Sequence, residues 1–288
     1  NLKFIFKIFK FTKLKDLLNF NFINEISYHS ILSRYIYETF NKFVSPKLKK
    51  VLMPYEGQPF QNAIFKKVHE INNDIITVGF IHSFPSGLPA NFFKREGHPK
   101  KIITTGESQA YCLNKYLAWD KKQIINLSST RYLKSKKKDM SNKIYLPLNF
   151  NNLKIIYENF LNFVNIKKIS LSNFKIQNHP SSLLSKKHAR LIVELKKIIS
   201  YSKKYEKKGK NFSIFIGPTA SIIEAIERNL EVVHICENPL LESYNLKLWK
   251  YIKSKSLNNN IFQYKILRKN KLINFGNKFN LPHQYFAV

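Results

Sequence analysis

Between residues 49 and 129, short apolar runs alternate with segments whose apolar residues recur at helical spacing. Apolar and β-branched runs of about four to eight residues predict strands, and recurrence at i, i+3 and i+4 predicts helices. We expect strands over residues 49–56, 74–83, 100–106 and 123–129, and helices over 60–71 and 107–117. This alternation predicts a parallel sheet flanked by helices.

A second series of the same kind follows a lysine-rich stretch at residues 134–143, where we expect a linker. Two successive α/β series predict an α/β fold of two Rossmann-like lobes, residues 1–140 and 141–288. The strands expected in the second lobe are 143–148, 173–180, 211–217 and 231–236, with helices over 152–164, 184–203 and 219–229.

The composition fits a folded protein of two domains. The chain has 288 residues, of which 44% are hydrophobic and 14% aromatic, enough apolar surface to offset the entropy lost on ordering. Its net charge of +31 attracts phosphate-bearing partners. The excess is nearly all lysine, however, in a chain rich in Asn, Ile and Phe, a bias typical of AT-rich coding sequence. No recognition helix or zinc finger accompanies it, so we expect no nucleic-acid partner.

The opening segment, residues 1–18, alternates Lys with Phe, Ile and Leu. This pattern is typical of a helix lying on an anionic membrane, and equally of a core helix with a solvated face. The segment is too charged for a signal peptide, and no apolar run reaches the roughly 18–20 residues of a membrane span. We expect a cytoplasmic protein, with peripheral contact to the inner membrane face as one alternative. Because the chain starts with Asn1 rather than Met, we also expect a first lobe truncated at its N-terminus.

The spacing of the two cysteines and the absence of several catalytic motifs argue against some classes of metal site and enzyme. Cys112 and Cys236 lack the CxxC spacing of a metal site, so we expect buried thiols and no metal ligands. The chain also has no GxGxxG, no GKS/T loop, no HExxH and no GxSxG. Dehydrogenase, ATPase, zinc-protease and serine-hydrolase activities therefore lose support, and we expect no cofactor.

The most informative segment is GPTASIIEAIER, residues 217–228. A strand ends before Gly217, and either Thr219 or Ser221 can cap the helix that follows. Free backbone N–H groups, the helix dipole and the two hydroxyls then favour an anion. Glu224, one turn further along, can accept hydrogen bonds from a ribose. The alternative is simple capping, which every helix needs.

His179 and Pro180 end the strand expected at 173–180, on the edge where ligands enter open α/β sheets. The imidazole can donate to a phosphate or a base, and the proline fixes the turn that directs it. An ordinary solvated turn is the alternative.

In the first lobe, Glu56 and His82 each end an expected strand. If both face the crevice between the lobes, either is suited to act as a general base toward a substrate hydroxyl. Alternatively, Glu56 caps the next helix and His82 packs in the core.

Together these segments, from about residue 49 to 250, resemble bacterial GT-B glycosyltransferases that build surface carbohydrate such as capsule and O-antigen. Some of these proteins have the pattern Y-E-G-Q-P-x-x-x-A before a strand that ends in G-x-x-H-S. The matching residues here are Tyr55, Glu56, Gly57, Gln58, Pro59, Ala63, Gly79, His82 and Ser83.

His179-Pro180 and the later Ser/Thr-rich turn also resemble the nucleotide-binding motifs of bacterial GT-B sialyltransferases. That resemblance implies donor contacts by His179, Thr219 and Ser221. In those enzymes an acidic-Gly motif supplies the base; here only Glu56-Gly57 matches it, preceded by Tyr55 rather than a second acid.

The resemblance implies a metal-independent glycosyltransferase that moves a sugar from a nucleotide-sugar to a surface-polysaccharide or lipid-linked glycan precursor. The second lobe then holds the nucleotide, and Glu56 or His82 removes the acceptor proton. Three alternatives stay open: a glycerophosphate transferase, a nucleotide-sugar epimerase, and a non-enzymatic protein that binds anionic membrane or nucleic acid.

Overall fold

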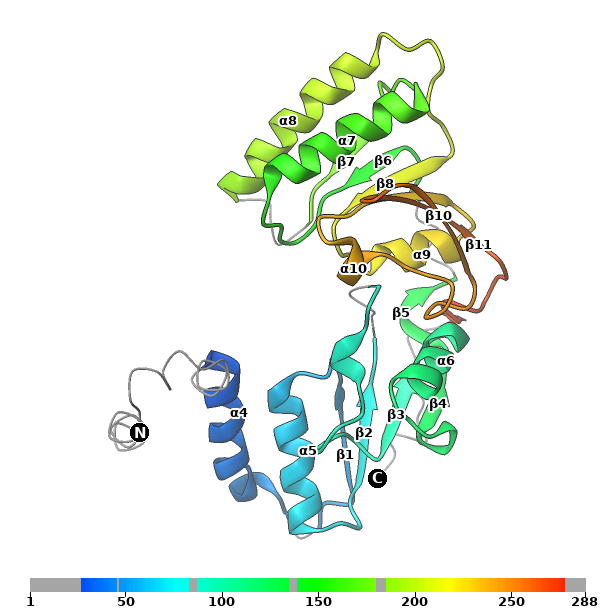
Figure 1. The fold of residues 1–288 in the computed structure, drawn as a ribbon. Helices are drawn as coiled ribbons and strands as arrows, with labels where there is room; N and C mark the ends of the chain where they lie inside the picture. The colour runs from blue at the N-terminus through cyan, green and yellow to red at the C-terminus, as the bar shows by residue number, and fades with distance from the viewer. Residues whose placement is uncertain (1–26, 46, 83–86, 135–138, 180–184, 278–288) are drawn as a thin grey trace. The chain divides into compact units, whose positions relative to one another are not determined.

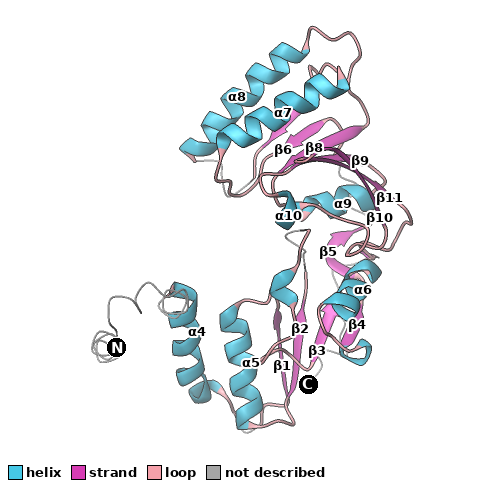
Figure 2. Cartoon of the chain, in the orientation of Figure 1, coloured by secondary structure: helices cyan, strands magenta, loops and turns pink. Residues whose placement is uncertain are grey.

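The computed structural model describes residues 27–45, 47–82, 87–134, 139–179 and 185–277. It shows a mixed α/β fold with parallel strands, drawn in Figures 1 and 2. Contacts divide the chain into two compact units: Asn1–Gly79 with Lys94–Lys101 and Val288, and Phe80–Phe93 with Ile102–Ala287. The boundary expected near residue 140 stays a prediction. No helix in the described part of the chain combines the length and apolar character that a membrane crossing requires.

The first unit contains α4 (Tyr28–Thr39), the 3-10 helix η1 (Phe40–Phe43), β1 (Lys50–Pro54), α5 (Pro59–Ile71) and most of β2 (Ile76–Phe80). Its core holds Tyr55, Phe65 and Val68, none of which has exposed area. Pro59 suits the first position of α5, where a missing N–H costs nothing. The Tyr37 hydroxyl ties α4 to α5 by donating to the Glu70 carboxylate.

The first part of the second unit contains η2 (Ala90–Phe92), most of β3 (Lys101–Thr104), α6 (Glu107–Tyr116), η3 (Lys121–Gln123), β4 (Ile124–Asn126) and β5 (Ser129–Leu133). β3 and β4 pair in parallel, with Ile102 opposite Ile124. Trp119 is buried, and its indole N–H donates to the Phe92 carbonyl over 2.7 Å.

The second unit contains a six-stranded sheet, in the order β10-β11-β9-β8-β6-β7. The strands β7, β6, β8 and β9 run parallel, whereas β11 pairs antiparallel with both β9 and β10. Their bounds are β6 (Lys143–Tyr145), β7 (Lys175–Gln177), β8 (Phe212–Ile216), β9 (Glu231–Ile235), β10 (Ile252–Asn258) and β11 (Ile261–Ile266).

The two faces of this sheet carry different helices, as Figure 1 shows. Side chains alternate along a strand with a period of two. One face packs against α7 (Leu153–Lys167) and α8 (Lys186–Ser202); its strand residues are Ile144, Ile214, Ile216, Val233 and Ile235. The other face carries Tyr145, Phe215 and His234, and there α9 (Ser221–Glu227) contacts β9 and β11.

After β11 the chain returns to the region of β3–β5. β12 (Phe275–Gly276) pairs in parallel with β5, and the Asn274 N–H donates to the Thr105 carbonyl over 2.7 Å. A Cβ at Gly106 would lie 1.9 Å from the Leu272 carbonyl oxygen, so this close approach requires glycine.

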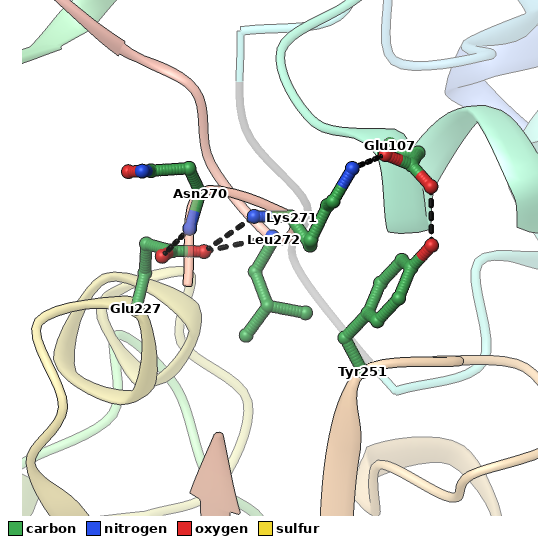
Figure 3. Close-up of polar contacts among 6 residues, drawn as sticks. All are labelled: Glu107, Glu227, Tyr251, Asn270, Lys271 and Leu272. Atoms are coloured by element: carbon green, nitrogen blue, oxygen red, sulfur yellow. Dashed lines mark hydrogen bonds and ion pairs between the residues drawn. The ribbon is translucent and has the colours of Figure 1, made fainter. Parts of the chain in front are cut away.

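Glu227, at the end of α9, holds the returning segment (Figure 3). Its carboxylate accepts the backbone N–H groups of Asn270, Lys271, Leu272 and Ile273, the last two over 2.8 and 3.1 Å. Nearby, the Lys271 ammonium and the Tyr251 hydroxyl both donate to Glu107. The short α10 (Pro239–Glu242) precedes this return.

The described strands and helices between β1 and β9 confirm most of the expected elements, with bounds shifted by a few residues. The helix expected over 219–229 is shorter, because α9 covers only Ser221–Glu227. β5, α10, the β10–β11 pair and β12 were not expected. Of the described residues of the expected linker, 134 and 139–142 form turns or irregular backbone, whereas Lys143 begins β6. The opening segment 1–18 and Pro180 lie outside the described residues.

Candidate functional site

The strands β6 and β8 form a topological switch point. They are parallel neighbours, yet the chain leaves β6 toward α7 on one face and leaves β8 toward α9 on the other. Between two such loops an open α/β sheet has a crevice at the carboxyl ends of its strands, where ligands bind. Residues 146–152 and 217–220 form the two loops here.

Gly217 fixes the second loop against the first. Its φ of 64° lies in the left-handed region that favours glycine, and a Cβ there would approach the Pro147 Cβ to 3.1 Å. The Gly217 N–H donates to the Ile235 carbonyl, and its carbonyl accepts from His234 Nε2, each over 2.9 Å. The turn after β8 is therefore held by β9 on one side and by the β6 loop on the other.

Thr219 and Ser221 follow this turn and are both half-buried. The prediction that one of them caps the helix is wrong, because Ala220 occupies the N-cap with helical φ and ψ and makes no side-chain cap bond. The Thr219 hydroxyl instead accepts the Ser221 N–H over a long 3.4 Å. The chain enters α9 already helical, so neither hydroxyl sits where a capping side chain would.

Glu224 points into the protein rather than toward solvent. It is 7% exposed and pairs with Arg228 over 3.0 Å, and the Arg228 guanidinium lies 4.7 Å from the Phe275 ring centre. Burial raises the pKa of the neighbouring Tyr145 to about 12, with a contribution from the Glu224 charge. Among the described residues, the buried Tyr145 hydroxyl has no hydrogen-bond partner. Glu224 therefore already serves a structural ion pair, and its ribose contact stays a prediction.

His179 follows β7 and is half-buried. β6 separates β7 from β8, so His179 ends a strand two positions away from the strand that ends before Gly217. The carboxyl ends of these parallel strands share one edge of the sheet, which is the edge that holds the switch point.

The first turn of α8 contributes residues that the sequence analysis missed. Buried His188 bonds the Pro147 carbonyl through Nε2 over 2.8 Å, and its ring meets the Phe150 ring edge-on. Lys187 donates to the Phe150 carbonyl. Lys186 and Lys187 lie at the positive end of the helix dipole, where cations are unfavourable and an anion is favoured. The run KKHAR directly after Ser185 is the signal that marks this turn.

The N-terminus of α7 is already filled by a protein carboxylate. Glu237, just after β9, accepts the backbone N–H groups of Asn151, over 2.9 Å, and Asn152. An external anion would have to displace this carboxylate. The anion-binding potential of the edge therefore lies with the turn after β8 and the first turn of α8.

Glu56 and His82 lie just beyond β1 and β2. The Glu56 N–H donates to Gln61 Oε1 over 2.9 Å, and Gln58 occupies the N-cap of α5. The alternative in which Glu56 caps that helix is therefore wrong. His82 is half-buried, 6.5 Å from the Phe80 ring, so it is not a core residue. The catalytic roles of both residues stay predictions.

A groove in the first unit, about 260 Å³ in volume, runs between α4 and α5. A salt bridge of 2.8 Å between Lys66 and Glu96 closes part of its wall. The predicted site residues are not among those that line it, which are Ser33, Arg34, Tyr37, Pro59, Asn62, Ala63, Lys66 and Glu96.

No family model, curated protein or solved structure matches this chain. The site is therefore defined by its own geometry.

Cys112 and Cys236 are both free and buried, as the sequence predicts. Cys236 does not stand alone, because its sulfur lies 3.5 Å from His234 Nδ1. Desolvation by burial lowers the pKa of His234 to about 4, which keeps the ring neutral near pH 7. Sequence spacing had suggested no ligand set around either cysteine.

Proposed function

We propose that the chain is a two-lobed GT-B glycosyltransferase that moves a sugar from a nucleotide-activated donor to a surface-polysaccharide or lipid-linked glycan precursor. The observation that supports it best is the switch point between β6 and β8, with the Gly217 turn packed against Pro147. Open α/β sheets bind nucleotides at such points. In this proposal residues 141–288 form the donor lobe and residues 1–140 the acceptor lobe.

The donor phosphates bind to the turn after β8 and to the first turn of α8. Thr219 and Ser221 supply hydroxyl donors, and His179 at the neighbouring strand end supplies an imidazole N–H. Lys186 and Lys187 neutralise phosphate charge, which also removes their unfavourable interaction with the α8 dipole. The sugar leaves with its bond to the donor phosphate broken, so these cations and hydroxyls stabilise the departing nucleotide.

The acceptor hydroxyl approaches from the acceptor lobe, where Glu56 or His82 takes its proton as the new glycosidic bond forms. Of the two, the better candidate is the residue whose variant loses turnover while still binding nucleotide. Exclusion of water around the donor limits its hydrolysis.

The first test is thermal denaturation of the full chain with uridine, cytidine, guanosine and thymidine diphosphates, and with cytidine monophosphate. A ligand that binds only the native state raises Tm by mass action. We expect one nucleotide class to raise Tm, with Ser221→Ala and His179→Ala each abolishing most of that shift. Ser254→Ala, on the exposed strand β10, is the matched control and retains it.

The second test is turnover of the matching nucleotide-sugar with product identification. Loss of turnover by orders of magnitude in His179→Ala and Ser221→Ala supports the proposal, provided both variants melt cooperatively. Unchanged turnover in both, or no Tm shift with any nucleotide, contradicts it. A product that carries glycerophosphate, or an epimerised free donor, assigns the site to one of those activities instead.

A further inference from the structure

Three side chains with metal-binding atoms meet where β9 ends and α10 begins. His234 and Cys236 come from β9 and the residue just after it, and Glu242 comes from α10. Their ligand atoms all lie within 4.8 Å of one another. The residues are 0%, 0% and 7% exposed, so the group is closed from solvent. His234 and Cys236 are two residues apart in extended backbone, which puts both on the same face of the sheet.

The histidine directs an unprotonated ring nitrogen to this group. Its Nε2 lies 2.9 Å from the Gly217 carbonyl oxygen, which can only accept, so Nε2 carries the proton. Nδ1 is then unprotonated and faces the Cys236 sulfur at 3.5 Å. A histidine ligand typically donates its other N–H to a backbone carbonyl in this way.

The spacing of the sulfur and Nδ1 fits two ligands of a tetrahedral ion, and the Glu242 oxygen lies within 4.8 Å of both. With Zn–S of about 2.3 Å and Zn–N of about 2.0 Å, two ligands at a tetrahedral angle lie about 3.5 Å apart. The sulfur and Nδ1 are separated by 3.5 Å here. The Glu242 carboxylate is oriented by the Glu237 and Asn238 N–H groups, each over 3.0 Å, and its remaining lone pairs are available to a metal.

Two tyrosines complete the surroundings. The Tyr264 hydroxyl accepts the Tyr244 N–H over 3.0 Å and lies 3.4 Å from His234 Nδ1. Tyr244 is 1% exposed, and its own hydroxyl has no partner among the described residues. Burial raises the pKa of Tyr244, with smaller contributions from Tyr132, Cys236 and Glu242, and its ring centre lies 6.2 Å from that of His234. A buried hydroxyl without a partner is costly unless a ligand-bound atom or a water completes it.

We propose that His234, Cys236 and Glu242 bind one divalent metal ion of the zinc class in a closed structural site. Metal binding releases the Cys236 thiol proton to solvent as the sulfur–metal bond forms, so affinity rises with pH. Through His234 and Gly217 the ion fixes the turn that follows β8. This inference does not depend on the proposed transferase activity.

The test uses the full chain purified without a histidine tag. Elemental analysis is expected to find about one zinc per chain, and removal of zinc by a strong chelator lowers Tm until zinc is restored. Cobalt(II) added to the metal-free protein gives a thiolate-to-cobalt charge-transfer band and the intense visible bands of tetrahedral coordination. Both experiments use the unaltered protein, so they hold even where a variant fails to fold.

Two cysteine variants identify the sulfur. Cys236→Ser loses the charge-transfer band, whereas Cys112→Ala, which removes the only other thiol, keeps it. Metal-free protein that shows no thiolate band with cobalt, together with a Tm insensitive to chelator, overturns the proposal. The three residues are then a metal-free network in which the thiol donates to His234. The nucleotide-induced Tm shift is measured separately, so failure of one proposal does not imply failure of the other.

Discussion

The helices α4 and α9 are held in place by opposite means. α4 has twelve residues, none of them buried, and its side-chain contacts include an exposed ion pair between Arg34 and Glu38. α9 has only seven residues, but every one after Ser221 is buried. An isolated helix shorter than about 12–15 residues is marginal in water. α9 therefore exists because its surroundings fix it, and this makes it the better platform for a binding site.

The carboxylates of the two helices show the same contrast. Glu227 has no cationic partner among the described residues and accepts four backbone N–H groups. Glu224 forms a buried ion pair, while Glu38 forms a pair with more than half of each side chain exposed. If the burial of a carboxylate determines how much its contacts contribute to the free energy of unfolding, replacing the more buried carboxylates must cause the larger losses of stability.

Glu227→Ala is expected to cause the largest loss. It leaves four N–H groups of the returning segment without their acceptor. Those of Leu272 and Ile273 are buried, and each unsatisfied buried donor costs about 1–3 kcal/mol of unfolding free energy. Urea denaturation measures the loss. Glu227→Gln keeps one acceptor oxygen and must lose less. A change below about 0.5 kcal/mol in Glu227→Ala, the range of ordinary surface substitutions, would show that the segment is held by other contacts.

Glu224→Ala and Arg228→Ala form the next pair. Each removes one partner of a buried, charge-assisted hydrogen bond, at a cost of about 1.5–3 kcal/mol. The two variants differ in ligand binding: if Glu224 also holds a ribose, only Glu224→Ala loses the nucleotide-induced Tm shift. Equal shifts in both variants would reduce Glu224 to a structural role.

The stability of Glu107→Gln relative to wild type is expected to depend on pH, which separates the contribution of a partly exposed carboxylate from those of the buried ones. Bonds from Lys271 and then Tyr251 hold the pKa of Glu107 below its ordinary value of 4.5. The carboxylate therefore contributes stability above about pH 4.5, and this contribution disappears as the pH falls through the lowered value. We expect Glu107→Gln to be less stable by about 0.2–1 kcal/mol at pH 7, and this difference to shrink as the pH falls from 4.5 through the lowered pKa of Glu107. Melting curves across this range check it; a constant difference would contradict it.

Glu38→Ala is expected to have the smallest effect. An exposed i,i+4 pair on a helix contributes about 0.3–0.5 kcal/mol and weakens with added salt. Urea denaturation at low and high salt measures it, with Arg34→Ala as the matched control. A loss larger than about 1 kcal/mol would mean that α4 carries stability beyond its exposed contacts.

The sequence predicted the elements whose signals are local. Pro59 marks the start of α5, and the apolar run of β8 ends at Gly217, whose positive φ matches the expected turn. These signals depend only on neighbouring residues, so the order of strands and helices from β1 to β9, apart from β5, could be derived in advance.

What the sequence missed depends on distant partners. β10 exposes a run of Lys and Ser that resembles a loop, and it becomes a strand only by pairing with β11. Glu227 binds backbone groups more than 40 positions away, which no side-chain pattern reveals. The prediction that Thr219 or Ser221 caps α9 was wrong for the same reason, because the packing of the Gly217 turn already sets the backbone at the start of α9.

The return of the chain to β5 has a consequence for the order of folding during synthesis. Ser129 is synthesised well before Phe275, its pairing partner in β12. Gly106 is likewise synthesised well before Leu272, which it contacts in the folded chain. Until residues 270–276 have left the ribosome, β5 lacks β12 and the four N–H groups that Glu227 accepts are not yet in place. Such late, long-range pairing slows folding. We expect chains that end before Lys271 to retain the six-stranded sheet but to lack the returning segment, whose strand β12 pairs with β5. Such chains are expected to be more susceptible to proteolysis in the cell.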